Sequence, residues 1–166
     1  MIDDTMLAYK FRAVKNIGVI SDTHNLLRLE ADKALQNSEL IIHAGDIGNQ
    51  QILNELKKIA PVVAVRGNSD NFEWCETLPV DLTISVGEIE IFIIHNLKDL
   101  VVENLSRKTK VIITGHSHKP LIEEKKGVIY LNPGSAGRRR FKLPTSLAKL
   151  YIEEKVVKAE IIELMV

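Results

Sequence analysis

The chain of 166 residues contains a single cysteine, Cys75. One cysteine cannot form an internal disulfide, and nothing in the cysteine usage suggests an oxidising compartment. A cysteine-rich zinc site is excluded as well. Any metal bound by this chain must therefore be held by histidine, aspartate, glutamate or asparagine side chains.

A net charge is also lacking, because 22 lysines and arginines balance 22 aspartates and glutamates. No global field therefore favours nucleic acid or an acidic membrane as a partner. The only dense basic cluster is "GRRRF" at 137–141. One of Arg138, Arg139 and Arg140 is a candidate to contact a substrate phosphate, and a solvated loop is the alternative.

Long apolar runs are absent, since no stretch approaches the roughly 20 apolar residues of a membrane span. The opening stretch "MIDDTMLAYKFRAVKN" has neither the basic start nor the apolar run of a secretory signal. We therefore expect a cytoplasmic protein with no membrane partner. The length fits a single domain over 1–166, with 1–15 as an N-terminal lead-in that is either a surface segment or an edge contact.

The first half of the chain alternates strand-like and helix-like segments. Their pattern predicts strands at 17–21, 40–46 and 62–70 and helices at 26–37 and 50–60. Asn25 is placed to cap the first of these helices. Strand, helix, strand, helix, strand is typical of parallel βαβ units.

The second half is rich in predicted hairpins. We expect hairpins at 82–95, 121–135 and 146–164, with turns at Gly87-Glu88, Lys126-Gly127 and Glu154-Lys155, a short helix at 97–107 and a strand at 110–114. Parallel units followed by hairpins indicate two packed sheets flanked by helices.

Polar side chains follow five of these strands at the point where each strand ends. They are Asp22 and His24, then Asp46, then Asn68, then His95, and finally His116 and His118. Sites in open α/β sheets gather at the carboxyl ends of strands. Carboxylate, imidazole and amide groups suit manganese, iron, zinc, magnesium or nickel. Seven such side chains are enough to hold two metal ions, with one carboxylate bridging them.

These motifs resemble those of the calcineurin-like metallophosphoesterase superfamily, and within it the small single-domain phosphodiesterases of bacteria and archaea. The resemblance rests on "SDTH", "GDIGN", "GNSD", "IIHN" and "GHSH", followed by "NPGS", and it covers nearly all of 16–164. It implies a four-layer α/β/β/α sandwich of two mixed sheets flanked by helices, with the site at one edge of both sheets.

The resemblance also implies a role for each of the seven residues. Asp22, His24 and His118 would hold metal one, Asn68, His95 and His116 would hold metal two, and Asp46 would bridge them. Manganese is the expected metal, with nickel, zinc, iron and magnesium as alternatives. Asn68, Asp46 and His95 are the predicted catalytic residues.

Two departures from the family pattern concern the substrate. Larger members of the superfamily carry a histidine at the position of Ser69, and that histidine contacts the phosphate. Asn96 and Leu97 replace the Gly-His that often follows the ligand at His95. The group that protonates the leaving alcohol is therefore not assigned.

The predicted activity is hydrolysis of a small phosphate ester through a hydroxide bound between the two metals. The main alternative is a phosphoesterase fold retained for protein contacts without catalysis. A nuclease is a third interpretation, which the neutral net charge disfavours. A homo-oligomer is a further expectation. Around the site, we expect His43 to pack, Asp70 to orient the Asn68 loop or to form a plain turn, and 132–135 to form a turn beneath it.

Overall fold

Two β-sheets pack face to face in the computed structural model, which describes residues 9–11 and 14–166. The six-stranded sheet has the order β1-β5-β6-β7-β9-β8. Its strands are β1 Tyr9–Phe11, β5 Asp81–Val86, β6 Ile89–Ile94, β7 Thr109–Ile113, β8 Leu121–Lys125 and β9 Val128–Asn132.

The five-stranded sheet has the order β11-β10-β2-β3-β4. Its strands are β2 Asn16–Ile20, β3 Leu40–His43, β4 Val62–Ala64, β10 Ser146–Glu153 and β11 Val156–Glu163. Strand β3 is buried along its whole length, as expected of an apolar strand covered on both faces. Both sheets are mixed, because each contains parallel and antiparallel pairs.

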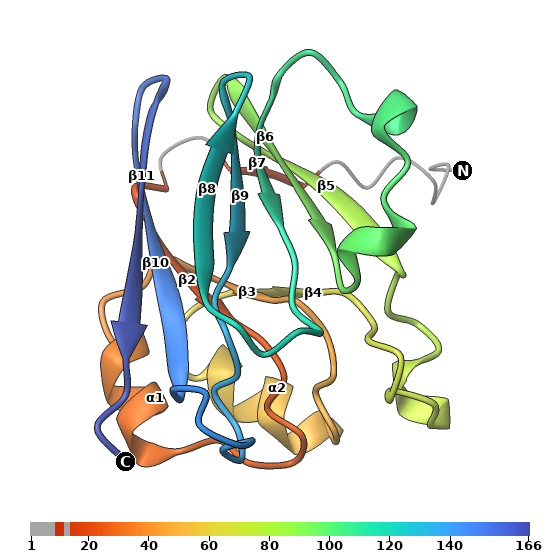
Figure 1. Cartoon of the computed structure of the whole chain (residues 1–166), viewed down its shortest axis with the longest axis vertical. Coiled ribbons are helices and arrows are strands. Elements are labelled where there is room, and N and C mark those ends of the chain that lie inside the picture. The colour runs from red at the N-terminus through yellow and green to blue at the C-terminus, as the bar shows by residue number, and fades with distance from the viewer. Residues whose placement is uncertain (1–8, 12–13) are drawn as a thin grey trace.

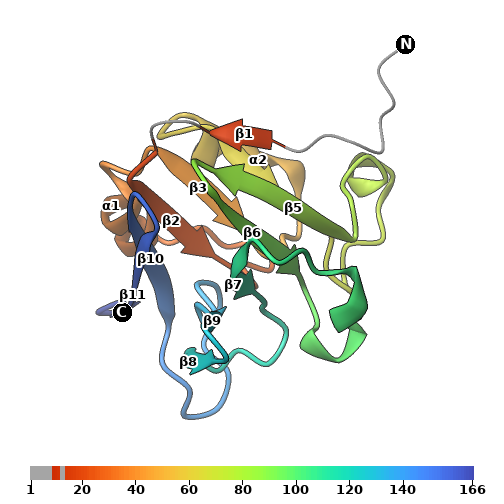
Figure 2. The ribbon, with the colours of Figure 1, turned by 90° about the horizontal axis from the view of Figure 1, so that it is seen from above.

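Two α-helices cover the outer face of the five-stranded sheet, and 3-10 turns cover the other sheet (Figures 1 and 2). The helices are α1 Leu29–Leu35 and α2 Gln50–Lys57, and the 3-10 turns that cover the six-stranded sheet are Leu97–Asp99 and Val102–Asn104. A further 3-10 turn, Glu73–Cys75, contributes Trp74 to the apolar cluster of the helices and the five-stranded sheet. No helix in the described part of the chain is long and apolar enough to cross a membrane.

Three apolar clusters separate these layers. The largest lies between the two sheets and includes Ile42 and Ile93, both fully buried. A second joins the helices to the five-stranded sheet, and the third places Leu100 and Leu105 against the outer face of β6 and β7. Burial of this apolar surface is the main force that holds the layers together. The predicted four-layer fold is confirmed.

The three predicted hairpin turns are confirmed at Gly87-Glu88, Lys126-Gly127 and Glu154-Lys155. The predicted helix at 97–107 is wrong, because that segment forms two 3-10 turns whose leucines pack on the sheet. Residues 9–11 of the lead-in form an edge strand parallel to β5. The other residues of the lead-in up to 8, together with 12 and 13, lie outside the described residues.

The predicted cap at Asn25 is also wrong. Helix α1 begins at Leu29, and its N-cap residue is Arg28. The Asn25 amide N–H instead donates to the Ile47 carbonyl at 3.1 Å, which ties this segment to the loop after β3. The side-chain Oδ1 of Asn25, the atom with which a capping asparagine would accept, instead accepts from Asn49 Nδ2 at 2.9 Å.

Candidate metal centre

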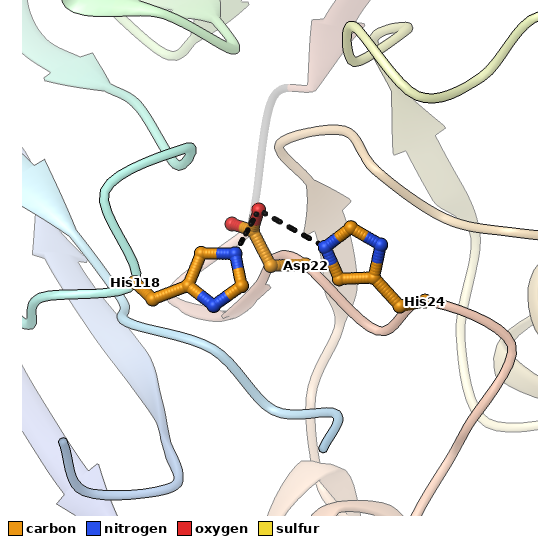
Figure 3. Close-up of side chains that lie close together, drawn as sticks. All are labelled: Asp22, His24 and His118. Carbon is orange, nitrogen blue, oxygen red and sulfur yellow. Dashed lines mark ion pairs between the residues drawn. The ribbon is translucent and has the colours of Figure 1, made fainter. Parts of the chain in front are cut away.

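The first half of the candidate site is formed by Asp22, His24 and His118 (Figure 3). Asp22 Oδ1 lies 3.1 Å from His118 Nε2 and 3.8 Å from His24 Nε2. The two imidazole centroids are 5.4 Å apart. Figure 3 shows both rings turning a nitrogen toward the same carboxylate, the arrangement that a shared cation requires.

The second half is formed by Asn68, His95 and His116. Asn68 Oδ1 lies 3.1 Å from His95 Nε2 and 3.0 Å from His116 Nδ1. The two imidazole centroids are 5.3 Å apart. His95 Nδ1 lies 2.7 Å from the Ala44 carbonyl, to which it donates its proton, so the lone pair of Nε2 faces the site.

Asp46 lies between the two halves. Its Oδ2 is 3.6 Å from His24 Nε2 and 3.3 Å from His95 Nε2. Its other oxygen, Oδ1, accepts a hydrogen bond from the Ser69 backbone N–H at 2.9 Å. Oδ2 is therefore the atom that faces both halves. The structure brings all seven predicted residues together, and their role as metal ligands stays a prediction.

Most of these residues have an unusual backbone conformation. Positive φ angles occur at Asp22 (54°), His24 (42°), Asp46 (54°), His116 (69°) and His118 (61°). Non-glycine residues rarely adopt this region, and such conformations concentrate at functional sites. The strand-end loops therefore turn sharply, and each turn presents its side chain to the common centre.

Two glycines allow the loops to approach each other closely. A Cβ atom at Gly67 would collide with the backbone and carboxylate of Asp46, and a Cβ at Gly115 would collide with the Ser21 hydroxyl. The glycines of the "GN" and "GH" motifs thus have a steric role. Any larger side chain would push the ligand-bearing loops apart.

Asp22 is held in place by several donors. Its Oδ2 accepts hydrogen bonds from the Ser21 hydroxyl at 2.6 Å and from the His116 backbone N–H at 3.1 Å. Its carbonyl accepts from the Ser135 hydroxyl at 3.0 Å. Ser21 and Ser135 were not predicted as supporting residues, because a serine next to a strand end carries no distinctive signal.

Asp70 holds the loops after β3 and β4 together. Its carboxylate accepts from the backbone N–H groups of Gly67 at 2.9 Å, Ile47 at 3.0 Å and Gly48 at 3.1 Å. The predicted orienting role of Asp70 is confirmed, and it extends to the loop that carries Asp46. Asn132 acts similarly on the "GHSH" loop, because its Nδ2 donates to the Gly115 carbonyl at 2.8 Å.

His43 is fully buried beneath the site. The Gly45 N–H donates to its Nδ1 at 3.2 Å, and Thr23 Oγ1 lies 3.0 Å from its Nε2. The Thr23 hydroxyl proton is already donated to the Ile47 carbonyl at 2.8 Å. The proton of His43 therefore resides on Nε2, and the ring is neutral. Its predicted packing role is confirmed, and burial lowers the pKa of His43 to about 4.

The charges of the cluster shift one another's pKa values. Burial alone would raise the pKa of Asp46, but His95 and the Ser69 N–H lower it well below its usual range. Burial alone would lower the pKa of His95, but the Asp46 and Asp22 carboxylates raise it. The carboxylates are thus ionised, as metal ligands must be.

His24 behaves differently from His95. Burial lowers its pKa, and the positive charge of Arg140 lowers it further, against the opposing effect of Asp46 and Asp22. Arg140 belongs to an exposed loop that starts at Gly137, which packs directly against the backbone of Asp22 and Thr23. The basic cluster therefore lies on the His24 side of the site.

The donor set fits divalent cations. His24 Nε2 is a buried atom without a hydrogen-bond partner among the described residues, and the neighbours of buried Asp22 Oδ1 are imidazole nitrogens, with His118 Nε2 at 3.1 Å. A buried polar atom without a partner is costly and calls for an explanation such as an ion. Both atoms face the centre of the cluster, where a cation held by Asp22, His24, His118 and Asp46 would satisfy them.

Comparison with known proteins identifies the family. Residues 16–155 match the model of the calcineurin-like phosphoesterase superfamily domain. The chain belongs to this superfamily. It is 38% identical over 155 residues to a probable metallophosphoesterase of Methanocaldococcus jannaschii. The aligned region covers 84% of this chain and 77% of the relative.

Solved structures agree on the fold. A structure described as a novel archaeal phosphodiesterase matches with a TM-score of 0.73 and 25% identity, over 89% of this chain and 99% of that chain. Vps29 of Chaetomium thermophilum matches with a TM-score of 0.74 and 17% identity, over 90% of this chain and 97% of that chain. At that identity, the second likeness concerns the fold alone.

Proposed function

We propose that this chain is a metal-dependent phosphodiesterase with a dinuclear centre. The observation that carries the proposal is the convergence of seven donor side chains from five strand ends, with His24 Nε2 buried and without a hydrogen-bond partner among the described residues. The presence of all seven donors argues against a scaffold without catalysis.

The two halves of the site suggest two cation positions. Asp22, His24 and His118 would hold one cation, Asn68, His95 and His116 would hold the other, and Asp46 would be shared between them. When bound, divalent cations supply a water of lowered pKa as the nucleophile and neutralise charge on the phosphate. Manganese is our proposed metal, and nickel, zinc, iron and magnesium are the alternatives, since all of them accept oxygen and imidazole donors without thiolates.

The chain's own groups hold the reacting centre rigid. The Ser69 N–H keeps Oδ1 of Asp46 occupied, so Oδ2 remains directed at the centre. The Ala44 carbonyl fixes the ring of His95 in the same way. Such preorganisation matters because small misplacements of catalytic groups cost large factors in rate.

Protonation of the leaving group has no evident donor. Ser69 is exposed and its hydroxyl is a poor acid. Asn96 uses its Oδ1 to accept the Lys98 N–H at 3.1 Å. We therefore expect aryl esters, whose leaving groups need no proton, to react faster than alkyl esters.

The direct test is turnover of bis-p-nitrophenyl phosphate by protein prepared with Mn²⁺. We expect hydrolysis by the wild-type chain and its loss in His116→Ala. Lys119→Ala is the matched control, because Lys119 is an exposed residue of the same loop, and it should retain activity. No turnover with any divalent metal would instead indicate a scaffold. A small phosphate ester is the proposed substrate and the cytoplasm the proposed compartment.

A further inference from the structure

A cavity of about 420 Å³ adjoins the second half of the metal centre. Asn68 and His95 form part of its wall, and Arg66, Asn71, Asn96 and Asp99 line the rest together with apolar side chains. Larger cavities around Lys15 and Val156 contain none of the seven site residues. This volume falls in the range of small-molecule sites.

Arg66 is the distinctive residue of this cavity. It follows β4, and its backbone N–H donates to the Pro79 carbonyl at 2.8 Å, which fixes the start of its side chain. Arg66 is half-buried. Its guanidinium forms no hydrogen bond or ion pair with any residue in the described ranges 9–11 and 14–166.

The carboxylates that line the cavity form no ion pair with Arg66. Asp70 also lines the cavity, but its oxygens accept backbone N–H groups from Gly67, Ile47 and Gly48. Asp99 is exposed and is not ion-paired with Arg66. A half-buried guanidinium without a partner is unfavourable in the free protein, and it is the group best suited to bind a carboxylate or phosphate with two hydrogen bonds.

The position of the cavity indicates which part of a substrate would bind in it. Its wall includes Asn68 and His95 but none of Asp22, His24 and His118. A group held there lies beside the second half of the centre, while the phosphate that is cleaved lies at the centre itself. The cavity is thus suited to an ester group next to the cleaved phosphate.

We propose that Arg66 selects substrates in which an ester group carries a second anion, a carboxylate or a further phosphate. This inference rests on the proposed phosphodiesterase function, because it names the substrate class of that site. Asn71 and Asn96 offer additional polar contacts along the same wall. Arg66 here determines specificity, and it does not act on the bond that breaks.

The test compares two non-hydrolysable probes of equal size, (4-carboxybenzyl)phosphonate and (4-carbamoylbenzyl)phosphonate. Their binding to the manganese-loaded protein is measured by calorimetry. We expect the wild-type chain to prefer the carboxylate probe by about tenfold, as one charged bidentate contact would give. Arg66→Gln should bring the two affinities to within about twofold.

Two further variants keep the test decisive. Arg107→Gln removes an exposed arginine that does not line the cavity, and it should keep the preference. Arg66→Lys retains the charge and should keep part of it, which guards against a folding defect in Arg66→Gln. The proposal is overturned if neither probe binds, if the wild-type chain shows no preference, or if Arg66→Gln leaves the preference unchanged.

Failure of this inference is distinguishable from failure of the proposed function. Turnover of bis-p-nitrophenyl phosphate without any preference between the probes would refute the role of Arg66 alone. An Arg66-dependent preference without turnover of any ester would refute the phosphodiesterase while supporting the anion subsite.

Discussion

His118 Nε2 lies 3.1 Å from Asp22 Oδ1, although the two residues follow strands of different sheets. Asp22 comes after β2 of the five-stranded sheet, and His118 comes after β7 of the six-stranded sheet. The candidate centre is thus built across the contact between the sheets. A cation bound there would link the two layers directly.

The first prediction follows from this link. Removal of divalent metal with a chelator should lower the thermal midpoint by about 5–10 °C, because a ligand present at 100 times its Kd stabilises the folded state by about 2.7 kcal/mol. Differential scanning calorimetry with and without Mn²⁺ measures the shift. In His118→Ala, Mn²⁺ should raise the thermal midpoint by much less than in the wild-type chain. An equal rise in both proteins would contradict the assignment of His118 as a metal ligand.

Asp70 should matter for stability without being a ligand. Asp70→Ala leaves three backbone N–H groups, those of Gly67, Ile47 and Gly48, without their acceptor. We expect the free energy of unfolding of the metal-free protein to fall by about 2–4 kcal/mol. Asp70→Asn retains one oxygen and should lose less, as urea unfolding will show. Equal stability of all three proteins would exclude this role.

His43 makes the metal-free protein sensitive to acid. Its folded pKa is about 4, below the ordinary value of 6.5. Between these values, the unfolded chain binds one proton more than the folded chain does, so the free energy of unfolding rises with pH across this window. The loss on acidification from pH 6.5 to 4 is on the order of 3 kcal/mol.

His43→Gln isolates this effect, since glutamine offers a donor and an acceptor but does not titrate. Urea unfolding of both metal-free proteins at intervals from pH 4 to 7 gives, for each protein, the slope of the free energy of unfolding against pH. We expect a shallower slope for the variant. Parallel slopes would show that His43 is not the group responsible.

Arg140 should assist the site from the His24 side. Because its charge lowers the pKa of His24, Arg140→Gln should raise that pKa and let protons compete with metal at higher pH. The acid limb of the activity profile should therefore move upward in pH, and kcat/KM should fall about tenfold if Arg140 also contacts the substrate phosphate. Arg138→Gln is the matched control in the same exposed loop. If the two variants had identical pH profiles of activity, Arg140 would have no specific effect on the site.

Much of the fold could be predicted because its signals are local. Glycine at Gly87 and Gly127 marks hairpin turns, and polar residues that follow apolar strands mark the edge where the strands end. The candidate ligands could be found in this way because each occupies such a strand end. The short helix expected at 97–107 was wrong, since Leu100 and Leu105, each of which follows a 3-10 turn, pack on the sheet.

Other features depend on contacts between distant segments. The three amides on Asp70, the tautomer of His43 and the surroundings of the Arg66 guanidinium exist only when the loops after β2, β3, β4 and β6 are brought together. No periodicity or motif encodes them. Sequence patterns therefore predicted which side chains gather at the site and that Asp70 and His43 support them, but not the hydrogen bonds through which they do so or the cavity beside the site.

The most direct measurement is anomalous diffraction from crystals of the protein grown with Mn²⁺. Two anomalous peaks are predicted, one among Asp22, His24 and His118 and one among Asn68, His95 and His116, with Asp46 between them. Absence of any peak at this cluster, under conditions where manganese is in excess, would contradict a dinuclear centre held by these seven side chains.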